Sequence, residues 1–424
     1  MVVLNITDGA FVGHGVGGEA LAAVNIAAPV FNIMTAIGLM FGTGSSVSAS
    51  ILLSRGKTKA ARIHITQSMM AAVIVTIGIQ MAMLLNLEGT CRLFGGSDSL
   101  VEPAAEYLKW IVLFLPLNMV GMVGEFIVRL DGSPRYAMAC TLVAATLNIL
   151  LDWLFIFPFG WGLRGAAIAT ALSFSVSALM SLTYILFFSR TIHFSRFSLL
   201  KKSTDEDELL MANLFHQIKM GFPAFLGEMA VTCTIIVGNF VFTRYLGDAG
   251  VAAYSVACYC MPIGFMLGNS ITQSSQPIIS FAYGTGNRPR TAHAQRVSVM
   301  SALIGGLLGT SLLLLGTPLV TRIFISSDES AFSLTMQGLP LFSLSFLFLI
   351  VNLALIGCLQ SVEQSARANL FMLLRGFIFV VPCFVVLPRV WGITGIWLAI
   401  PVTEALTTFC IAFYMIIHRK SLKH

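Results

Sequence analysis

Long apolar stretches, separated by short polar turns, run along almost the whole chain. Ile65–Leu87 and Val297–Val320 are two examples, and each is as long as the roughly 20 residues with which an α-helix crosses the hydrocarbon core of a bilayer. None of the stretches shows the alternation of apolar and polar residues that is typical of outer-membrane barrel strands. The pattern therefore predicts an all-α polytopic membrane protein.

The apolar stretches repeat at a fixed offset. A shift of 230 residues aligns identical residues without a gap, among them Gly38 with Gly268, Asp98 with Asp328 and Trp161 with Trp391. Each half is predicted to hold six spans, which fall near 1–15, 22–52, 62–86, 104–128, 136–158 and 164–189, and near 216–244, 250–282, 292–320, 332–359, 367–388 and 394–417. Six spans return each half to the same side of the membrane. We therefore expect twelve transmembrane helices in two parallel six-helix repeats, with a substrate path between them.

A polar segment divides the two repeats. We predict an N-terminal six-helix lobe over 1–189, a cytoplasmic linker over 190–214 and a C-terminal six-helix lobe over 215–424. The repeat also predicts that the first helix is truncated, because its counterpart begins at a position that would precede Met1. We expect the native protein to have roughly ten to twenty further N-terminal residues, or Met1 to be an internal methionine.

Composition narrows the class of protein. Charged residues make up 10% of the chain and hydrophobic residues 57%, whereas an ordinary soluble protein is roughly 25% charged. So few charges cannot cover the surface of a soluble enzyme, a nucleic-acid-binding protein or a disordered chain. The eight cysteines show no metal-binding spacing. The chain also lacks a phosphate-binding loop, which favours coupling to an ion gradient over direct use of ATP.

The basic residues predict the orientation in the membrane. Eighteen of the 25 Lys and Arg residues, with Arg55, Arg129, Arg290 and Arg375 among them, fall in the loops on one side of the predicted spans. The positive-inside rule places these loops, the linker and the C-terminus in the cytoplasm. The predicted location is the plasma (inner) membrane, which the chain crosses several times.

Ionisable groups inside membrane spans are costly and mark functional sites. Asp8, Asp152 and Thr170 each lie six residues from the predicted outer end of a span, so all three lie about 9 Å from it along their helices. Asn148 is one turn deeper than Asp152 on the same helix face. This all-oxygen set suits Na⁺, and it suits equally well two carboxylates that share a proton.

The second half of the chain provides a comparison. The counterparts of these four positions are Gly238, Ile378, Pro382 and Ile400. A polar network that merely ties helices together would be expected in both copies of a duplicated fold. The single copy therefore favours a coupling-cation site, with buried structural acids as the other interpretation.

Three further acidic residues lie within predicted spans. Glu125 precedes Arg129 by four residues, which allows an i,i+4 ion pair as well as a transport role. Glu228 follows Pro223 by five residues, and Glu404 has no evident partner. Glu228 and Glu404, together with Gln276, are candidates for a second protonation or substrate site.

Several motifs together resemble the multidrug and toxic compound extrusion (MATE) family of efflux transporters, in its DinF-like prokaryotic branch. The motifs are Thr7–Gly13, Ala20–Ala23, Leu147–Asp152, Trp161–Ala167 and Gln276–Gly284. The resemblance implies antiport of cationic or amphipathic organic compounds against H⁺ or Na⁺. It also implies a coupling-cation site at Asp8, Asn148, Asp152 and Thr170. The chain lacks the start of the first helix, and Glu228 departs from the family's spacing after the proline of the seventh helix.

The resemblance leads to an expected set of partners and excludes others. We expect a monomeric xenobiotic transporter in a lipid bilayer, with small-molecule substrates, no nucleic-acid partner and no cofactor other than bound Na⁺. The alternative is a flippase of lipid-linked saccharides, but anionic headgroups would favour basic residues within the spans, where acidic residues are found. A membrane enzyme or receptor would need a catalytic cluster or a sensor domain, and neither is visible.

Overall fold

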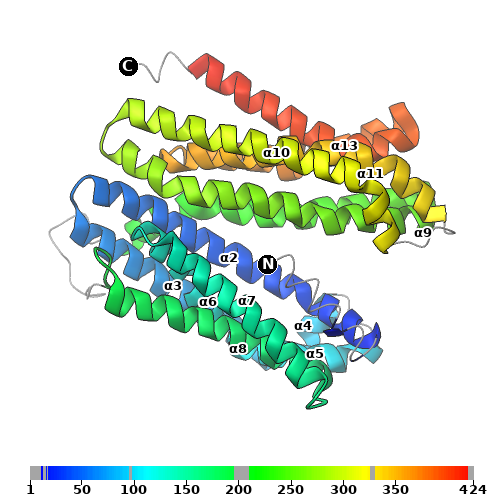
Figure 1. Ribbon diagram of the computed structural model, residues 1–424, viewed down its shortest axis with the longest axis horizontal. Helices are drawn as coiled ribbons and strands as arrows, with labels where there is room; N and C mark the ends of the chain where they lie inside the picture. The colour runs from blue at the N-terminus through cyan, green and yellow to red at the C-terminus, as the bar shows by residue number, and fades with distance from the viewer. Residues whose placement is uncertain are drawn as a thin grey trace. The chain divides into compact units, whose positions relative to one another are not determined.

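The computed structural model describes residues 11–12, 16, 18–94, 98–194, 210–324 and 330–418, and every regular element in these residues is a helix (Figure 1). The first half contains α2 (Gly18–Ser54), α3 (Thr58–Leu85), α4 (Leu87–Leu93), α5 (Asp98–Leu113), α6 (Leu115–Leu130), α7 (Pro134–Ile156), α8 (Gly162–Thr183) and the π-helix η1 (Tyr184–Phe188). The second half contains α9 (Leu210–Gly284), α10 (Arg288–Phe324), α11 (Ser330–Ser361), α12 (Ser365–Leu373), the π-helix η3 (Leu374–Ile378) and α13 (Val380–His418).

The predicted class of an all-α polytopic membrane protein is confirmed. Among the described residues, eight helices are long and apolar enough to cross a membrane, or nine when α5 and α6 count as one bent span. Two long helices contain breaks at glycines in the left-handed region, Gly247 in α9 and Gly392 in α13. These breaks separate spans that the sequence predicted as distinct. The first predicted span lies mostly outside the described residues, and Asp8 lies outside them with it.

One predicted span has a different form from the one expected. The apolar stretch 104–128 was predicted as a continuous helix, but α5 and α6 meet there at an angle of 53°. Pro116 is in the first turn of α6, and Phe114 is its N-cap. Proline has no N–H to continue the ladder of a preceding helix and disfavours helical backbone in the residue before it. Pro116 lies within an apolar stretch, so no polar residue in the sequence marked the point at which the helix bends.

The internal repeat is visible in the backbone conformation. Gly56 and Gly286, which are related by the 230-residue shift, have φ of 75° and 72°. Gly162 and Gly392, which are related in the same way, have φ of 55° and 57°. A side chain is strained in this left-handed region, so the paired glycines fix the same turns in both halves.

The chain forms two compact units, Met1–Phe225 and Leu226–His424, and the boundary lies inside α9. Each unit has its own apolar core. Ile65, Leu108 and Met119 are fully buried in the first, and Phe242 and Phe384 are fully buried in the second. The first unit therefore includes the beginning of α9, which packs against α2.

The packing of α2 against the beginning of α9 depends on two glycines. A Cβ atom built on Gly221 would lie 1.8 Å from the backbone carbonyl oxygen of Met40, and one built on Gly44 would lie 2.1 Å from the carbonyl oxygen of Gln217. Backbone atoms cannot move aside as a flexible side chain can. The two helices can approach this closely only without side chains at the crossing point.

Substituting Gly221 with alanine should therefore destabilise the protein by at least about 3 kcal/mol, because its methyl group must push two backbones apart. Gly78 offers a matched control within α3, since a Cβ atom there would meet nothing within 4 Å. Gly78→Ala should leave the stability within about 1 kcal/mol of the wild type. Thermal unfolding of the purified variants in detergent measures both values, and equal melting temperatures would contradict the crossing geometry.

Three loops of the first unit meet at one end, around the carboxylate of Asp131. This carboxylate accepts hydrogen bonds from the Thr191 hydroxyl (2.6 Å), the Arg190 N–H (2.9 Å) and the Tyr184 hydroxyl (3.0 Å). The Nε atom of Arg62 in turn donates to the Thr191 carbonyl oxygen at 2.8 Å. The turn before α7, the segment after η1 and the start of α3 are thus held together.

The Asp131 carboxylate should stabilise the fold at neutral pH. Burial by itself would raise the pKa of this carboxyl, but the hydrogen bonds from Thr191, Arg190 and Tyr184 lower it below its usual value. A carboxyl whose pKa is lowered by folding stabilises the protein above its unfolded pKa of about 3.9, and this effect is lost as the pH falls through the folded pKa.

Asp131→Ala should therefore cost about 2 to 3 kcal/mol at pH 7 and clearly less at pH 3. Thermal unfolding of the variant and the wild type at both pH values measures the difference. Replacing the exposed Glu102 by alanine is the control and should change little at either pH. A difference that is the same at pH 3 and pH 7 would show that the carboxylate charge does not stabilise the three loops.

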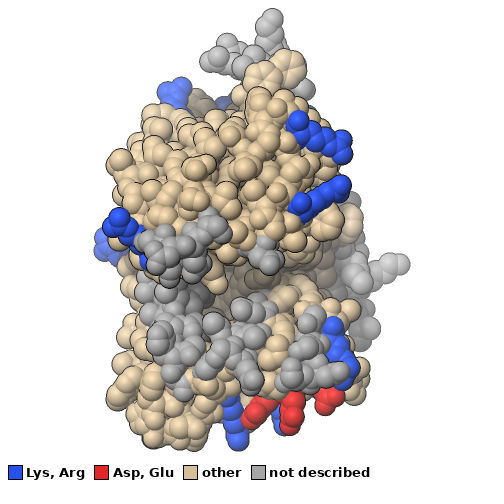
Figure 2. Space-filling model, turned by 90° about the vertical axis from the view of Figure 1, so that its right-hand side faces the viewer, with Lys and Arg blue, Asp and Glu red and all other residues tan. Residues whose placement is uncertain are grey.

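The end of the first unit that carries α4 and α5 has acidic and basic side chains, among them Glu88, Glu102 and Lys109, but fewer Lys and Arg residues than the end where the three loops meet. Figure 2, which views the molecule from this side, shows a mainly uncharged surface with separate Lys and Arg side chains and a group of Asp and Glu side chains at one edge. Arg62, Arg129 and Arg190 lie at the end where the three loops meet. The predicted assignment of that end to the cytoplasm follows from this difference in basic residues.

Candidate functional site

Three of the four predicted coupling-site residues lie together between α7 and α8. Asn148 and Asp152 on α7 are 2% and 0% exposed, and Thr170 on α8 is 6% exposed. The Asn148 Nδ2 atom donates a hydrogen bond to the Thr170 hydroxyl at 3.3 Å. The fourth predicted residue, Asp8, lies outside the described residues.

Small residues allow α7 and α8 to bring these side chains together. The two helices are joined by the turn 157–161, and a Cβ atom on Gly165 would lie 2.9 Å from the Cβ atom of Phe155. Ala166, Ala167 and Ala169 in α8 are fully buried. Close helix packing at small residues is the common mode of association in membranes, and it removes the site from lipid.

The site consists of hard oxygen donors in an apolar surrounding. The Oδ1 atom of Asn148 is buried and has no hydrogen-bond partner among the described residues. The buried carboxylate of Asp152 is one turn away on the same helix face. A buried charge is stable only with a compensating partner or a proton. Carboxylate, amide and hydroxyl oxygens suit a small hard cation or a proton, and the described residues contain no group of three His, Cys, Asp or Glu that could hold a metal ion.

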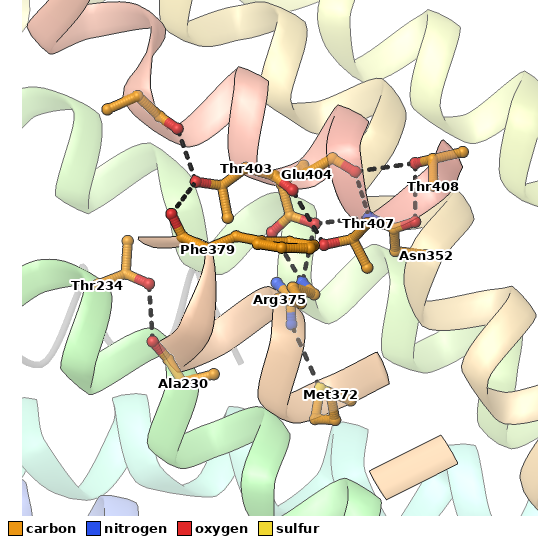
Figure 3. Close-up of polar contacts among 11 residues, drawn as sticks. Ala230, Thr234, Asn352, Met372, Arg375, Phe379, Thr403, Glu404, Thr407 and Thr408 are labelled. Carbon is orange, nitrogen blue, oxygen red and sulfur yellow. Dashed lines mark hydrogen bonds and ion pairs between the residues drawn. The ribbon is translucent and has the colours of Figure 1, made fainter. Parts of the chain in front are cut away.

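A second buried polar cluster lies in the other unit (Figure 3). Arg375 and Glu404 are both 3% exposed, and the Nε atom of Arg375 lies 2.7 Å and 2.9 Å from the two carboxylate oxygens of Glu404. Asn352 donates from Nδ2 to the Glu404 carboxylate at 2.8 Å, and the Thr408 hydroxyl donates to the Asn352 Oδ1 atom at 2.8 Å. The network joins α11, η3 and α13.

This cluster corrects two expectations from the sequence. Arg375 was predicted in a cytoplasmic loop, but it is buried in η3, ten residues after the first residue of α12. Glu404 was left without a partner, but it forms an ion pair with Arg375. The two residues are 29 positions apart on different helices. Only the tertiary packing of η3 against α13 reveals that each is the counter-ion of the other.

The remaining predicted residues lie at separate positions. Glu125 forms the expected ion pair with Arg129, with 3.2 Å between Oε2 and Nη2. Glu228 lies half-buried on α9, and its carboxylate takes part in no hydrogen bond or ion pair with the described residues. The Nε2 atom of Gln276, a residue that is 2% exposed, donates to the Gln360 Oε1 atom at 2.8 Å.

The chain matches a known family over most of its length. The family model described as MatE matches residues 1–154 and 223–385, which together are more than half of the chain. The protein belongs to the MATE family. The multidrug export protein MepA of Staphylococcus saprophyticus is 24% identical, over 98% of this chain and 89% of that protein. MepA of Staphylococcus aureus strain NCTC 8325 is 23% identical, over 96% of this chain and 87% of that protein.

Solved structures of MATE transporters have the same fold. One of them is described as the outward-facing conformation of a multidrug resistance MATE family transporter of the MOP superfamily. It matches with a TM-score of 0.89 at 22% identity, and the match covers 100% of this chain and 92% of that one. A MOP superfamily transporter from Pyrococcus furiosus, for which a binding pocket of reverse polarity and a different function are suggested, matches with the same TM-score at 21% identity. These relatives are membrane transporters rather than enzymes.

Proposed function

We propose that this MATE protein exports cationic or amphipathic organic compounds by antiport against H⁺ or Na⁺. The single observation that carries the proposal is the buried group of Asn148, Asp152 and Thr170 inside an otherwise apolar unit. Multidrug export by the relatives named MepA supports the substrate class. The predicted residue Asp8 completes the proposed coupling-cation site.

The burial of Asp152 provides a reason for coupling. An ionised carboxylate without a bound cation is costly in an apolar surrounding, and a bound proton or Na⁺ removes most of that cost. Binding of the cation therefore shifts the protein towards the conformations in which the site is neutralised. Exchange follows when substrate and cation compete or favour opposite states, because their binding free energies are then coupled.

Glu228 is our proposed second protonation site. It lies in a membrane-spanning helix, and no described residue provides a counter-ion for it. Glu404 is neutralised by Arg375, and Gln276 is held by Gln360. These two positions therefore support a role in packing or substrate contact better than a role in proton transfer. We further propose a monomer in the plasma (inner) membrane with the central linker and the C-terminus in the cytoplasm.

A susceptibility panel tests export directly. The gene is expressed in a bacterial host that lacks its main exporters, and growth is measured with ethidium, fluoroquinolones and bile salts. We expect higher inhibitory concentrations for several of these compounds, and less accumulated ethidium in energised cells. Unchanged resistance and accumulation, together with transfer of lipid-linked saccharides across vesicle membranes, would instead support the flippase.

A further inference from the structure

A row of polar side chains continues from the Asn148–Thr170 pair along α8. Thr170, Ser173, Ser177 and Ser181 recur at spacings of three and four residues, so they share one helix face. All four are buried, with exposures of 6%, 2%, 6% and 0%. The row runs from the level of the coupling site towards the end of the unit where the three loops meet.

The row reaches a carboxylate on α6. Ser177 donates a hydrogen bond to the Oε1 atom of Glu125 at 3.3 Å, and Thr141 of α7 donates to the same oxygen at 3.0 Å. Thr141 and Asn148 are seven residues apart, which places them on one face of α7, two turns from each other. We name the set Asp152, Asn148, Thr170, Ser173, Ser177, Thr141 and Glu125 the polar track.

Glu125 connects the buried track with the exterior. Its other oxygen, Oε2, is bound by Arg129 at 3.2 Å, and the two side chains are 19% and 24% exposed. Helix α6 ends one residue after Arg129. The groups that face the carboxylate are Arg129 from its own helix, Thr141 and Cys140 from α7 and Ser177 from α8.

The steps of the track on either side of Ser173 are not closed by its hydroxyl, which donates to the Ala169 and Thr170 carbonyl oxygens. Ser173 and Ser177 are one helical turn apart, about 6 Å along the axis. The Asn148 Oδ1 atom of the track is buried and has no hydrogen-bond partner among the described residues. Buried amide oxygens of this kind are usually satisfied by ordered water. A water molecule, the hydroxyl groups and the carboxyl groups can each both donate and accept, which proton transfer along a chain requires.

The other half of the protein lacks the track. The 230-residue shift converts Glu125 to Leu355 and Thr141 to Phe371, while Ser177 becomes Thr407. The unit that has the buried coupling residues also has the carboxylate at the end of the track. The other unit keeps hydroxyl groups at Thr403 and Thr407, but it has Leu355 in place of the carboxylate and apolar side chains at the positions that match Thr141, Asn148 and Thr170.

We propose that the coupling proton leaves Asp152 for the cytoplasm along this track, and that Glu125, in addition to Glu228 of the other unit, is a protonation site at its end. The inference rests on the proposed antiport. As Asp152 loses its proton, the track delivers one proton to the Glu125 carboxylate, which weakens the pair with Arg129. Glu125 then releases that proton to the solvent, and its ion pair re-forms.

Glu125→Gln tests the track, because the amide oxygen can still accept from Thr141 and Ser177 but the group cannot take up a proton. Purified variants are reconstituted into liposomes. Efflux driven by an imposed ΔpH is compared with the exchange of labelled for unlabelled substrate at equal pH, which needs no net proton movement. We expect ΔpH-driven efflux to fall at least about tenfold and exchange to stay close to the wild-type rate.

A double variant and a control complete the design. Thr141→Val with Ser177→Ala removes two hydroxyl groups of the track, should have the same effect, and decides the case if Glu125→Gln does not fold. Ser175→Ala is the matched control, since Ser175 is buried on α8 but lies two residues from Ser173 and from Ser177, on the opposite face of the helix, and donates to the Ala171 carbonyl oxygen. This control should behave as the wild type in both assays.

The other outcomes separate this inference from the proposed antiport. Full ΔpH-driven efflux by Glu125→Gln and by the double variant, with loss in Asp152→Asn, would overturn the track and leave the coupling site intact. Full efflux by Asp152→Asn as well would overturn the antiport. Equal losses of driven efflux and exchange would assign Glu125 a structural role only, and transport driven by Na⁺ alone would also overturn the track.

Discussion

Asp152→Asn should reduce gradient-driven efflux to the background of protein-free liposomes while leaving folded protein in the membrane. Asparagine has nearly the same shape as aspartate, but it cannot bind a proton and carries no charge to attract Na⁺. The Asp152 side chain is fully buried. Because asparagine keeps the volume of the buried side chain, the variant should still fold and reach the membrane.

Two comparisons make this result specific to the coupling site. Asp8→Asn should cause the same loss, although Asp8 lies outside the described residues. Glu102→Gln, which neutralises an exposed carboxylate on α5, should transport at the wild-type rate. Full efflux by both Asp8→Asn and Asp152→Asn would contradict the assignment of the site.

The second large effect concerns the Arg375–Glu404 ion pair. Arg375→Met or Glu404→Gln alone should cost about 3 to 5 kcal/mol of stability, because each leaves an uncompensated charge inside a membrane helix bundle. Arg375→Met combined with Glu404→Met should recover most of this loss, since no buried charge is left. Arg375→Met, Glu404→Met and the double variant form a double-mutant cycle with the wild type. The unfolding free energies of these proteins give the coupling energy of the pair. Unfolding of Glu404→Gln measures the cost of leaving Arg375 without its partner.

The same variants separate structural from transport roles. Arg367→Ala is the control at an exposed arginine that contacts Gln364 and Tyr414, and it should cost less than about 1 kcal/mol. The folded fraction of the Arg375–Glu404 double variant should still perform gradient-driven efflux. Strictly additive losses of stability would show that the two side chains do not interact, and loss of coupled transport in a stable double variant would give the pair a role in coupling.

Local patterns of the sequence were sufficient to predict the helical class and to group three residues of the proposed coupling site. Apolar length and breaks at residues such as Gly247 and Gly392 divide the chain into spans. Asn148, Asp152 and Thr170 could be grouped because their depth depends only on counting residues from the helix ends, and α7 and α8 are consecutive helices joined by a short turn. For adjacent antiparallel helices, equal depth nearly guarantees proximity.

Features that depend on contacts between distant helices could not be predicted in this way. The Arg375–Glu404 pair needs η3 and α13 to be packed side by side, and depth alone does not select one partner among many helices. The hydroxyl groups around Glu125 come from α7 and α8, and serine in a membrane helix usually bonds its own backbone, as Ser175 does. A spacing of three and four residues from Thr170 to Ser177 was the available signal for the polar track.

Counterflow of cation and substrate tests the central claim most directly. Substrate is added to the reconstituted protein, and the release of protons or of labelled Na⁺ is recorded. If the buried site on α7 and α8 holds the coupling cation, substrate should displace one of these ions from the wild type and neither from Asp152→Asn. Substrate transport without any cation release from the wild type, or equal release from Asp152→Asn, would contradict the account.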